Sequence, residues 1–298
     1  MSAEPPIIDQ AQLKGIICER PQNLAWFLGA GASRSAGLPT AADIIWYLKR
    51  RYYCQQENEE FSRQDVQLEA VRSRIQSYMA SKGFPTEWAP EEYSTCFEKI
   101  FGDDKERQRQ YLAGILAEDK ATLSVGNRVL GAMLSSGLSR AASTTNFDSI
   151  VEKAVAEVCG NSLSAYHIER SRSAVQALNN EEFPFYCKLH GDFRYDSVKN
   201  LAAELATQNA ELAQAFKIAA SRFGFLVVGF SGRDESVMTL FREAIDAPNA
   251  FPHGFYWTGI KGVPIAPAVE KLLSAARAKG VKAAYVAIET FDALMLRI

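Results

Sequence analysis

The chain has 298 residues, of which 47% are hydrophobic and 23% are charged, as is usual for a protein that is folded throughout. Its 33 Lys and Arg residues and 35 Asp and Glu residues give a net charge of −2, which argues against a dominant electrostatic surface for nucleic acid. The five cysteines are scattered without a Cys-x-x-Cys pair, so neither a disulfide framework nor a four-cysteine zinc site is indicated.

The N-terminal residues contain no cationic segment followed by an apolar run, so they do not resemble a secretory signal. The longest apolar runs are far too short to span a bilayer. We therefore expect a cytoplasmic protein without a membrane partner, and the length favours a single domain over residues 1–298.

Six short apolar runs end in glycine or a small polar residue and alternate with helical patterns. The predicted strands are Leu24–Leu28, Ala141–Thr145, Phe185–Leu189, Phe225–Val228, Phe255–Thr258 and Ala283–Ile288. This alternation predicts an α/β fold with a Rossmann-like parallel sheet and helices on both faces. Ligands of such sheets bind beyond the carboxyl ends of the strands, so functional residues are expected there.

The first two predicted strands are separated by far more chain than one crossover helix needs. Residues 44–137 have a mostly helical pattern, which breakers such as Gly83 and Pro85 divide into at least two pieces. This helical insertion follows the first strand and its glycine loop. Its mixed charges favour a solvated cap packed on the sheet, and a protein contact surface is the alternative.

The first predicted strand runs into Gly29-Ala30-Gly31-Ala32-Ser33. Two glycines spaced by one residue let a backbone approach a pyrophosphate, and a following helix offers N–H groups to the anion. Arg34 stands where the usual dinucleotide fingerprint has its third glycine. The loop is thus interpreted as a phosphate cradle, with a plain tight turn as the alternative.

Polar side chains also follow the second and third predicted strands. The amide of Asn146 can both donate and accept hydrogen bonds, which suits it to orient a water or a carboxamide. Asp148 is interpreted either as a site residue or as a cap of the helix predicted at Ile150–Val158. His190 is one of three histidines and precedes Gly191 at a strand end, where an imidazole can act as a general base; a hydrogen-bonded structural histidine is the alternative.

The fourth predicted strand ends in Gly229-Phe230-Ser231-Gly232. This loop supplies backbone N–H groups and a hydroxyl group that can bind a phosphate or a ribose.

In this order, the four motifs resemble those of the sirtuin superfamily from about Leu24 to Asp292, outside the helical insertion. Typical sirtuins have Gln where Thr145 stands, Asp-Phe-Arg where Thr40-Ala41-Ala42 stands, and a zinc module of four cysteines after the His-Gly pair. The chain is therefore similar to the divergent sirtuin-like (SIR2-like) NADase domains of bacterial anti-phage defence systems.

The resemblance implies an NAD+ hydrolase that cleaves the bond between nicotinamide and ribose, with NAD as its substrate and no metal. It implies that Asn146, His190 and Asp148 are catalytic, with His190 as the base. The implied NAD-binding positions are Gly29, Ala30, Gly31, Ser33, Thr145, Gly229, Phe230 and Ser231.

The resemblance also implies an effector that depletes cellular NAD when a partner triggers it. The implied partners are a sensor or activator of the Argonaute-like, ATPase or nucleotide-sensing kind, together with further copies of the chain. Two other functions stay open. One is an NAD-dependent protein deacylase, which the missing zinc cysteines disfavour. The other is a non-catalytic regulatory module that binds NAD or ADP-ribose, which the presence of Asn146 and His190 disfavours.

Overall fold

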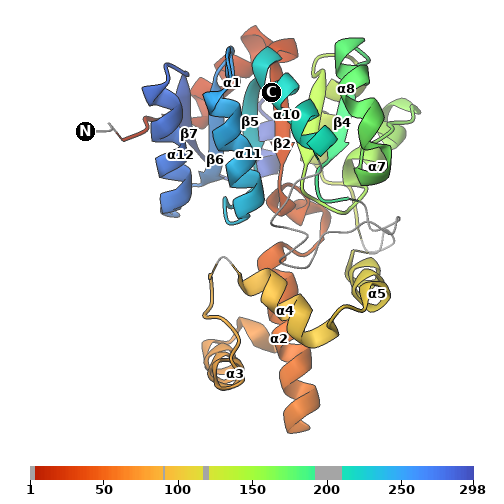
Figure 1. Ribbon diagram of the computed structural model, residues 1–298, viewed down its shortest axis with the longest axis vertical. Helices are drawn as coiled ribbons and strands as arrows, with labels where there is room; N and C mark the ends of the chain where they lie inside the picture. The colour runs from red at the N-terminus through yellow and green to blue at the C-terminus, as the bar shows by residue number, and fades with distance from the viewer. Residues whose placement is uncertain (1–3, 90, 117–120, 192–209) are drawn as a thin grey trace.

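The computed structural model describes residues 4–89, 91–116, 121–191 and 210–298. Its centre is a seven-stranded parallel sheet in the order β1-β7-β6-β5-β2-β3-β4 (Figure 1). The strands are β1 (Ile7–Asp9), β2 (Leu24–Leu28), β3 (Ala141–Thr144), β4 (Phe185–Lys188), β5 (Gly224–Val228), β6 (Phe255–Ile260) and β7 (Ala283–Ile288). The described α-helices are α1 (Gln10–Glu19), α2 (Ala41–Glu57), α3 (Glu69–Ser81), α4 (Glu92–Phe101), α5 (Lys105–Ile115), α6 (Val125–Ser135), α7 (Ile150–Cys159), α8 (Ser171–Asn179), α10 (Ala210–Arg222), α11 (Glu235–Asp246), α12 (Pro267–Ala278) and α13 (Phe291–Met295).

The predicted α/β fold is confirmed, and each of the six predicted strands is present within two residues of its expected bounds. The additional strand β1 is only three residues long and pairs with β7 at the edge of the sheet. Its two apolar residues, Ile7 and Ile8, are too few to show a strand pattern in the sequence.

The strand β2 shows why helices cover both faces of the sheet. Successive side chains of a strand point to opposite faces. Ala25 and Phe27 pack with α8, α10, α11 and α12 on one face, and Leu24, Trp26 and Leu28 pack with α1, α6, α7 and α13 on the other. All five residues are buried, so β2 lies at the centre of the core.

Apart from the edge strand β1, the strand order β4-β3-β2-β5-β6-β7 is that of a doubly wound dinucleotide-binding sheet. After β2 the chain continues to β3 on one side, whereas β5 pairs with β2 on the other side. The order of the strands therefore reverses at β2. Ligands of open α/β sheets bind at such a switch point.

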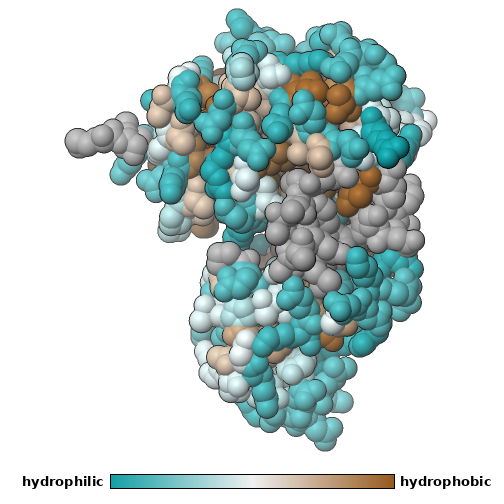
Figure 2. Space-filling view, viewed as in Figure 1, coloured by the Kyte–Doolittle hydropathy of each residue, from teal (hydrophilic) through white to brown (hydrophobic). Residues whose placement is uncertain are grey.

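The helices α2, α3, α4 and α5 lie below the sheet in Figure 1 and share a hydrophobic core of their own. Leu48, Ile75, Phe97 and Leu112 are fully buried in this core. The helices thus bury their apolar faces against one another, whereas we expected a cap packed on the sheet. On the face seen in Figure 2, their surface is mostly hydrophilic.

The helix α6 lies within the region predicted as the insertion but packs against α7 and α13. Its Leu130 and Leu134 belong to the hydrophobic core between the sheet and the helices α1, α6, α7 and α13. We therefore propose that the insertion consists of residues 41–116 and that α6 is the crossover helix between β2 and β3. No helix among the described ranges is long and apolar enough to cross a membrane.

Candidate functional site

A cavity of about 860 Å³ lies at the switch point, between the carboxyl ends of β2, β3 and β5 and the helices α2 and α4. The predicted site residues that line it are Ala30, Gly31, Thr145, Asn146, Asp148, His190, Gly229, Phe230 and Ser231. Gly29 and Ser33 lie outside the lining, and both accept hydrogen bonds from Asn146. The structure therefore brings the four separate motifs to one cavity.

The glycine loop after β2 packs directly against the loop after β5. The Gly31 N–H donates to the carbonyl oxygen of Gly229 at 2.9 Å. A Cβ atom at Gly29 would lie 2.5 Å from that oxygen, and one at Gly229 would lie 2.3 Å from the Ala32 nitrogen. The three glycines are thus required by the contact between the loops, whether or not they also approach a phosphate.

After Gly29 the chain forms short 3-10 turns at Ala30–Ala32 and Arg34–Ala36, and α2 begins only at Ala41.

We expect Gly229→Ala to destabilise the protein by about 2 kcal/mol or more beyond the cost of its left-handed backbone, because the added methyl group overlaps the glycine loop. Gly262→Ala is the matched control. The backbone φ of Gly262 is +83° against +69° for Gly229, and open space surrounds it. Calorimetric melting of both variants compares the two substitutions. Equal losses of stability would show that the two loops do not need this close approach.

Asn146 is held by three hydrogen bonds. Its backbone N–H donates to Thr144 Oγ1 at 2.9 Å, and its Nδ2 donates to the carbonyl oxygen of Gly29 and to Ser33 Oγ, both at 3.1 Å. Within the described ranges no group donates to its Oδ1. The side-chain amide of this cavity-lining residue is therefore fixed in orientation, and its oxygen keeps its capacity to accept a hydrogen bond. The Ser33 hydroxyl group that accepts one of these bonds belongs to a buried residue.

Asp148 is buried and its Oδ1 accepts the backbone N–H of Ile150 at 3.1 Å, at the start of α7. Its backbone carbonyl accepts from Lys188 Nζ at 2.6 Å. The Lys188 ammonium is fully buried and also contacts Glu152 Oε1 at 2.9 Å. The N-cap residue of α7 is Ser149, so Asp148 lies one residue before the cap and binds the first N–H of the helix; Asp148 also lines the cavity.

Lys188 was not recognised from the sequence, although a lysine inside an apolar run is an unusual feature. We expect Lys188→Met to reduce the free energy of unfolding by about 3–5 kcal/mol, because Glu152 would lose a buried cationic partner. Lys217→Met is the control, since its ion pair with Glu243 is exposed and such pairs contribute about 0–1 kcal/mol. Thermal unfolding of both variants compares them, and similar losses would contradict a supporting role for Lys188.

His190 lies two residues beyond β4, and its Nε2 lies 3.3 Å from Asp234 Oδ2. The other oxygen of Asp234 accepts the backbone N–H groups of Ser236 and Val237 and so caps α11. The carboxylate is therefore fixed by the helix that follows β5. Asp234 contacts the imidazole of His190, which is buried and lines the cavity. It was not recognised from the sequence, where it has the ordinary pattern of a helix cap.

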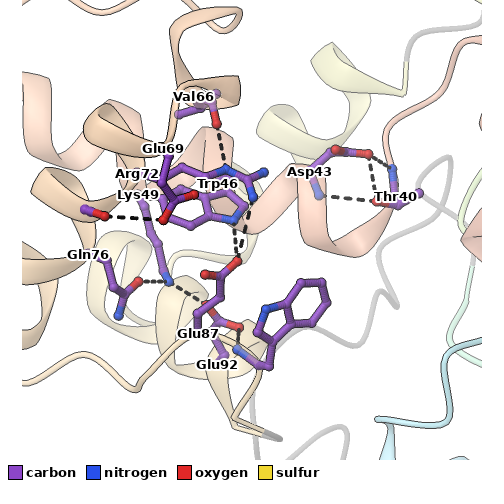
Figure 3. Close-up of polar contacts among 12 residues, drawn as sticks. Thr40, Asp43, Trp46, Lys49, Val66, Glu69, Arg72, Gln76, Glu87 and Glu92 are labelled. Atoms are coloured by element: carbon purple, nitrogen blue, oxygen red, sulfur yellow. Dashed lines mark hydrogen bonds and ion pairs between the residues drawn. The ribbon is translucent and has the colours of Figure 1, made fainter. Parts of the chain in front are cut away.

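The insertion supplies the opposite wall through Trp88, Glu92 and neighbouring residues. The guanidinium of Arg233, from the loop after β5, lies 3.5 Å from the centre of the Trp88 ring. Glu92 Oε2 accepts the Trp88 backbone N–H at 2.8 Å, and its Oε1 pairs with the buried Lys49 at 2.5 Å (Figure 3). Burial lowers the pKa of Arg233. A buried ion pair in the insertion thus fixes the position of Trp88. Arg233, from the loop after β5, contacts the ring of this tryptophan.

Within the described ranges no three His, Cys, Asp or Glu side chains are grouped as they would be around a metal ion. Three of the acidic residues that line the cavity, Asp148, Asp234 and Glu92, have a local partner in the protein. The polar groups best placed for chemistry on a bound molecule are the amide oxygen of Asn146, the imidazole of His190 and the hydroxyl of Ser231.

The sheet order and the cavity at its switch point define an α/β protein of the Rossmann-like class. Residues 140–282 match the family model described as SIR2-like domain. The matched segment runs from β3 to the end of α12 and includes Asn146, His190 and Ser231.

Among solved structures, the chain is similar to one described as "Structural Basis for the Mechanism and Regulation of Sir2 Enzymes". The two share 15% sequence identity with a TM-score of 0.41, over 91% of this chain and 96% of the other. The comparison with curated proteins finds no match.

Proposed function

We propose that the chain is an NAD+ hydrolase that breaks the bond between nicotinamide and ribose. The observation that carries the proposal is that Asn146, His190 and the glycine-containing loops after β2 and β5 line one cavity. These loops leave neighbouring strands at the switch point, where dinucleotides bind in sheets of this order. The SIR2-like domain supports NAD as the dinucleotide. The volume of about 860 Å³ lies within the usual range for ligand cavities.

In the proposed reaction, the bond from C1′ of the ribose to the nicotinamide nitrogen breaks, and nicotinamide leaves with the electron pair. A water molecule then bonds to C1′ and gives ADP-ribose. His190 accepts the proton that this water loses, and the fixed Oδ1 of Asn146 accepts a hydrogen bond from the water or from the leaving carboxamide. The loops at Gly31 and Ser231 hold the pyrophosphate and ribose. Positioning is the main contribution of the protein.

A product analysis tests this proposal against its two alternatives. The protein is incubated with NAD, alone, with an acetylated peptide and with the product of a neighbouring gene, and the products are separated by chromatography. We expect ADP-ribose and nicotinamide in equal amounts without peptide. Nicotinamide release that requires the peptide and forms O-acyl-ADP-ribose would identify a deacylase. Tight NAD binding without turnover in every mixture would identify a binding module.

We expect Asp234→Asn to reduce kcat about tenfold with little change in KM, because the imidazolium formed after proton uptake loses its carboxylate partner. Asparagine caps helices as well as aspartate does, so the stability of α11 should be retained. Initial rates over a range of NAD concentrations, together with a melting curve, provide the measurement. An unchanged kcat, or a loss explained by unfolding, would contradict this role for Asp234.

The resemblance to defence NADases supports a wider proposal, in which the chain depletes cellular NAD after a sensor partner activates it. An unregulated NAD hydrolase would exhaust the NAD of its own cell. We therefore expect low activity from the isolated chain and a large increase when the partner is added.

A further inference from the structure

A second pocket, of about 300 Å³, lies in the insertion between α2 and α5. Tyr47, Arg50 and Arg51 reach it from α2, Arg63 from the chain after α2, and Tyr111 from α5. Its lining contains no acidic residue. Different residues line it from those that line the cavity at the switch point.

The lining brings the like charges of three arginines together. In the part of the chain that the structure describes, none of Arg50, Arg51 and Arg63 forms an ion pair. The backbone N–H of Ser62 donates a hydrogen bond to the partly exposed carboxylate of Asp65 and is the largest cause of its lowered pKa, and the charge of Arg50 lowers this pKa as well. Like charges held together repel one another, so a bound anion would stabilise this arrangement.

Two buried polar atoms at the pocket have no partner. These are Arg50 Nε and the hydroxyl of Tyr111, for which no hydrogen bond is present within the described ranges. A buried donor without an acceptor costs free energy, so the polar groups at this pocket are incompletely satisfied. Arg50 is held in place because its Nη1 donates to the carbonyl oxygen of Phe61.

The environment of Tyr111 shows that the three cations converge. Burial raises the pKa of its hydroxyl to about 12, and the positive charges of Arg63, Arg51 and Arg50 oppose that rise. One phenol thus lies within the electrostatic reach of all three guanidinium groups. Planar guanidinium groups match phosphate oxygens in two parallel hydrogen bonds, which makes arginine clusters typical of phosphate sites.

Arginine side chains of the pocket stack on its two aromatic rings. Arg63 lies over the ring of Tyr47 at 4.8 Å, and Arg51 lies over the ring of Tyr111 at 5.8 Å. A compact, multiply charged ligand therefore fits better than a planar base. We propose that this pocket binds a diphosphate group, either as inorganic pyrophosphate or as the diphosphate of a nucleotide. The inference is independent of NAD hydrolysis. The helix α2 borders both pockets, since Ile44 and Ile45 line the larger one.

Calorimetric titration of the full chain with pyrophosphate, ADP and adenosine, at constant ionic strength near 0.15 M, tests the proposal. We expect saturable binding of pyrophosphate and ADP. The double variant Arg51→Gln/Arg63→Gln should weaken the binding of one or both at least tenfold. Tyr111→Phe retains the ring, and a smaller loss there would report on the buried hydroxyl. Arg107→Gln is the control, because Arg107 lies on α5 outside the pocket.

Weaker pyrophosphate binding in the double variant would identify the diphosphate alone as the ligand group. An effect on ADP only would identify a nucleotide diphosphate. The proposal would be overturned by absent saturable binding, by equal binding to the wild type and the double variant, or by an equal loss in Arg107→Gln. It would also be overturned if adenosine bound as tightly as ADP and with the same dependence on Arg51 and Arg63. Melting curves show whether each variant is folded.

Discussion

Replacing His190 by alanine is expected to reduce the rate of NAD+ cleavage about 10²–10⁴-fold, the usual contribution of a positioned general base. The buried imidazole lines the large cavity, and its Nε2 lies 3.3 Å from an oxygen of Asp234, a carboxylate that is itself fixed by α11. Without the ring, the water that attacks C1′ has no group to take its proton. The rate is measured with the partner that gives the highest wild-type turnover.

His253→Ala is the matched control for this prediction. His253 lies in the loop before β6 and outside the large cavity, so its removal should leave the rate unchanged. Both variants should bind NAD and melt close to the wild type. Full activity of His190→Ala, or an equal loss in both histidine variants, would exclude His190 as the base.

The substitution Asn146→Asp is expected to reduce NAD+ cleavage about 100-fold or more, although it changes the side chain by a single group. Asn146 Nδ2 donates to the carbonyl oxygen of Gly29 and to Ser33 Oγ. A carboxylate cannot donate, so its oxygen would face the Gly29 carbonyl and be repelled. The side chain would then turn, and a displacement of about 1 Å at a reacting group can cost a factor of 100.

Asn249→Asp provides the comparison, because the Asn249 amide also donates to a backbone carbonyl, that of Ser221, but on the exposed surface. We expect normal NAD cleavage in this variant. If Asn146→Asp retained normal kcat and KM, the hydrogen bonds that fix Asn146 would have no part in the reaction.

Most of the predicted strands were found because a buried strand is largely an apolar run that ends at a glycine or a polar residue, a purely local signal. The strand Leu24–Leu28 is buried on both faces and is therefore apolar at every position. The edge strand Ile7–Asp9 escaped prediction because its stability comes from pairing with β7, nearly the whole chain away.

The site was predictable where its residues directly follow strands, as Asn146 and His190 do. A parallel sheet brings such positions together whatever lies between them in the sequence. The contact of Trp88 with Arg233 was not predictable in this way. It depends on how the insertion packs, and its residues lie in unrelated segments. The sequence suggested glycines in the first loop for the approach of a phosphate. The structure shows a second requirement, because the backbone of Gly229 packs directly against them.

The central claim is that one NAD molecule lies at the switch point with its C1′ atom between Asn146 and His190. A crystal structure with a hydrolysis-resistant carbocyclic NAD analogue tests this claim most directly. We predict the pyrophosphate against the loops of Gly31 and Ser231 and the nicotinamide riboside between the amide and the imidazole. An analogue bound elsewhere, or one whose reacting carbon lies away from both side chains, would contradict the claim.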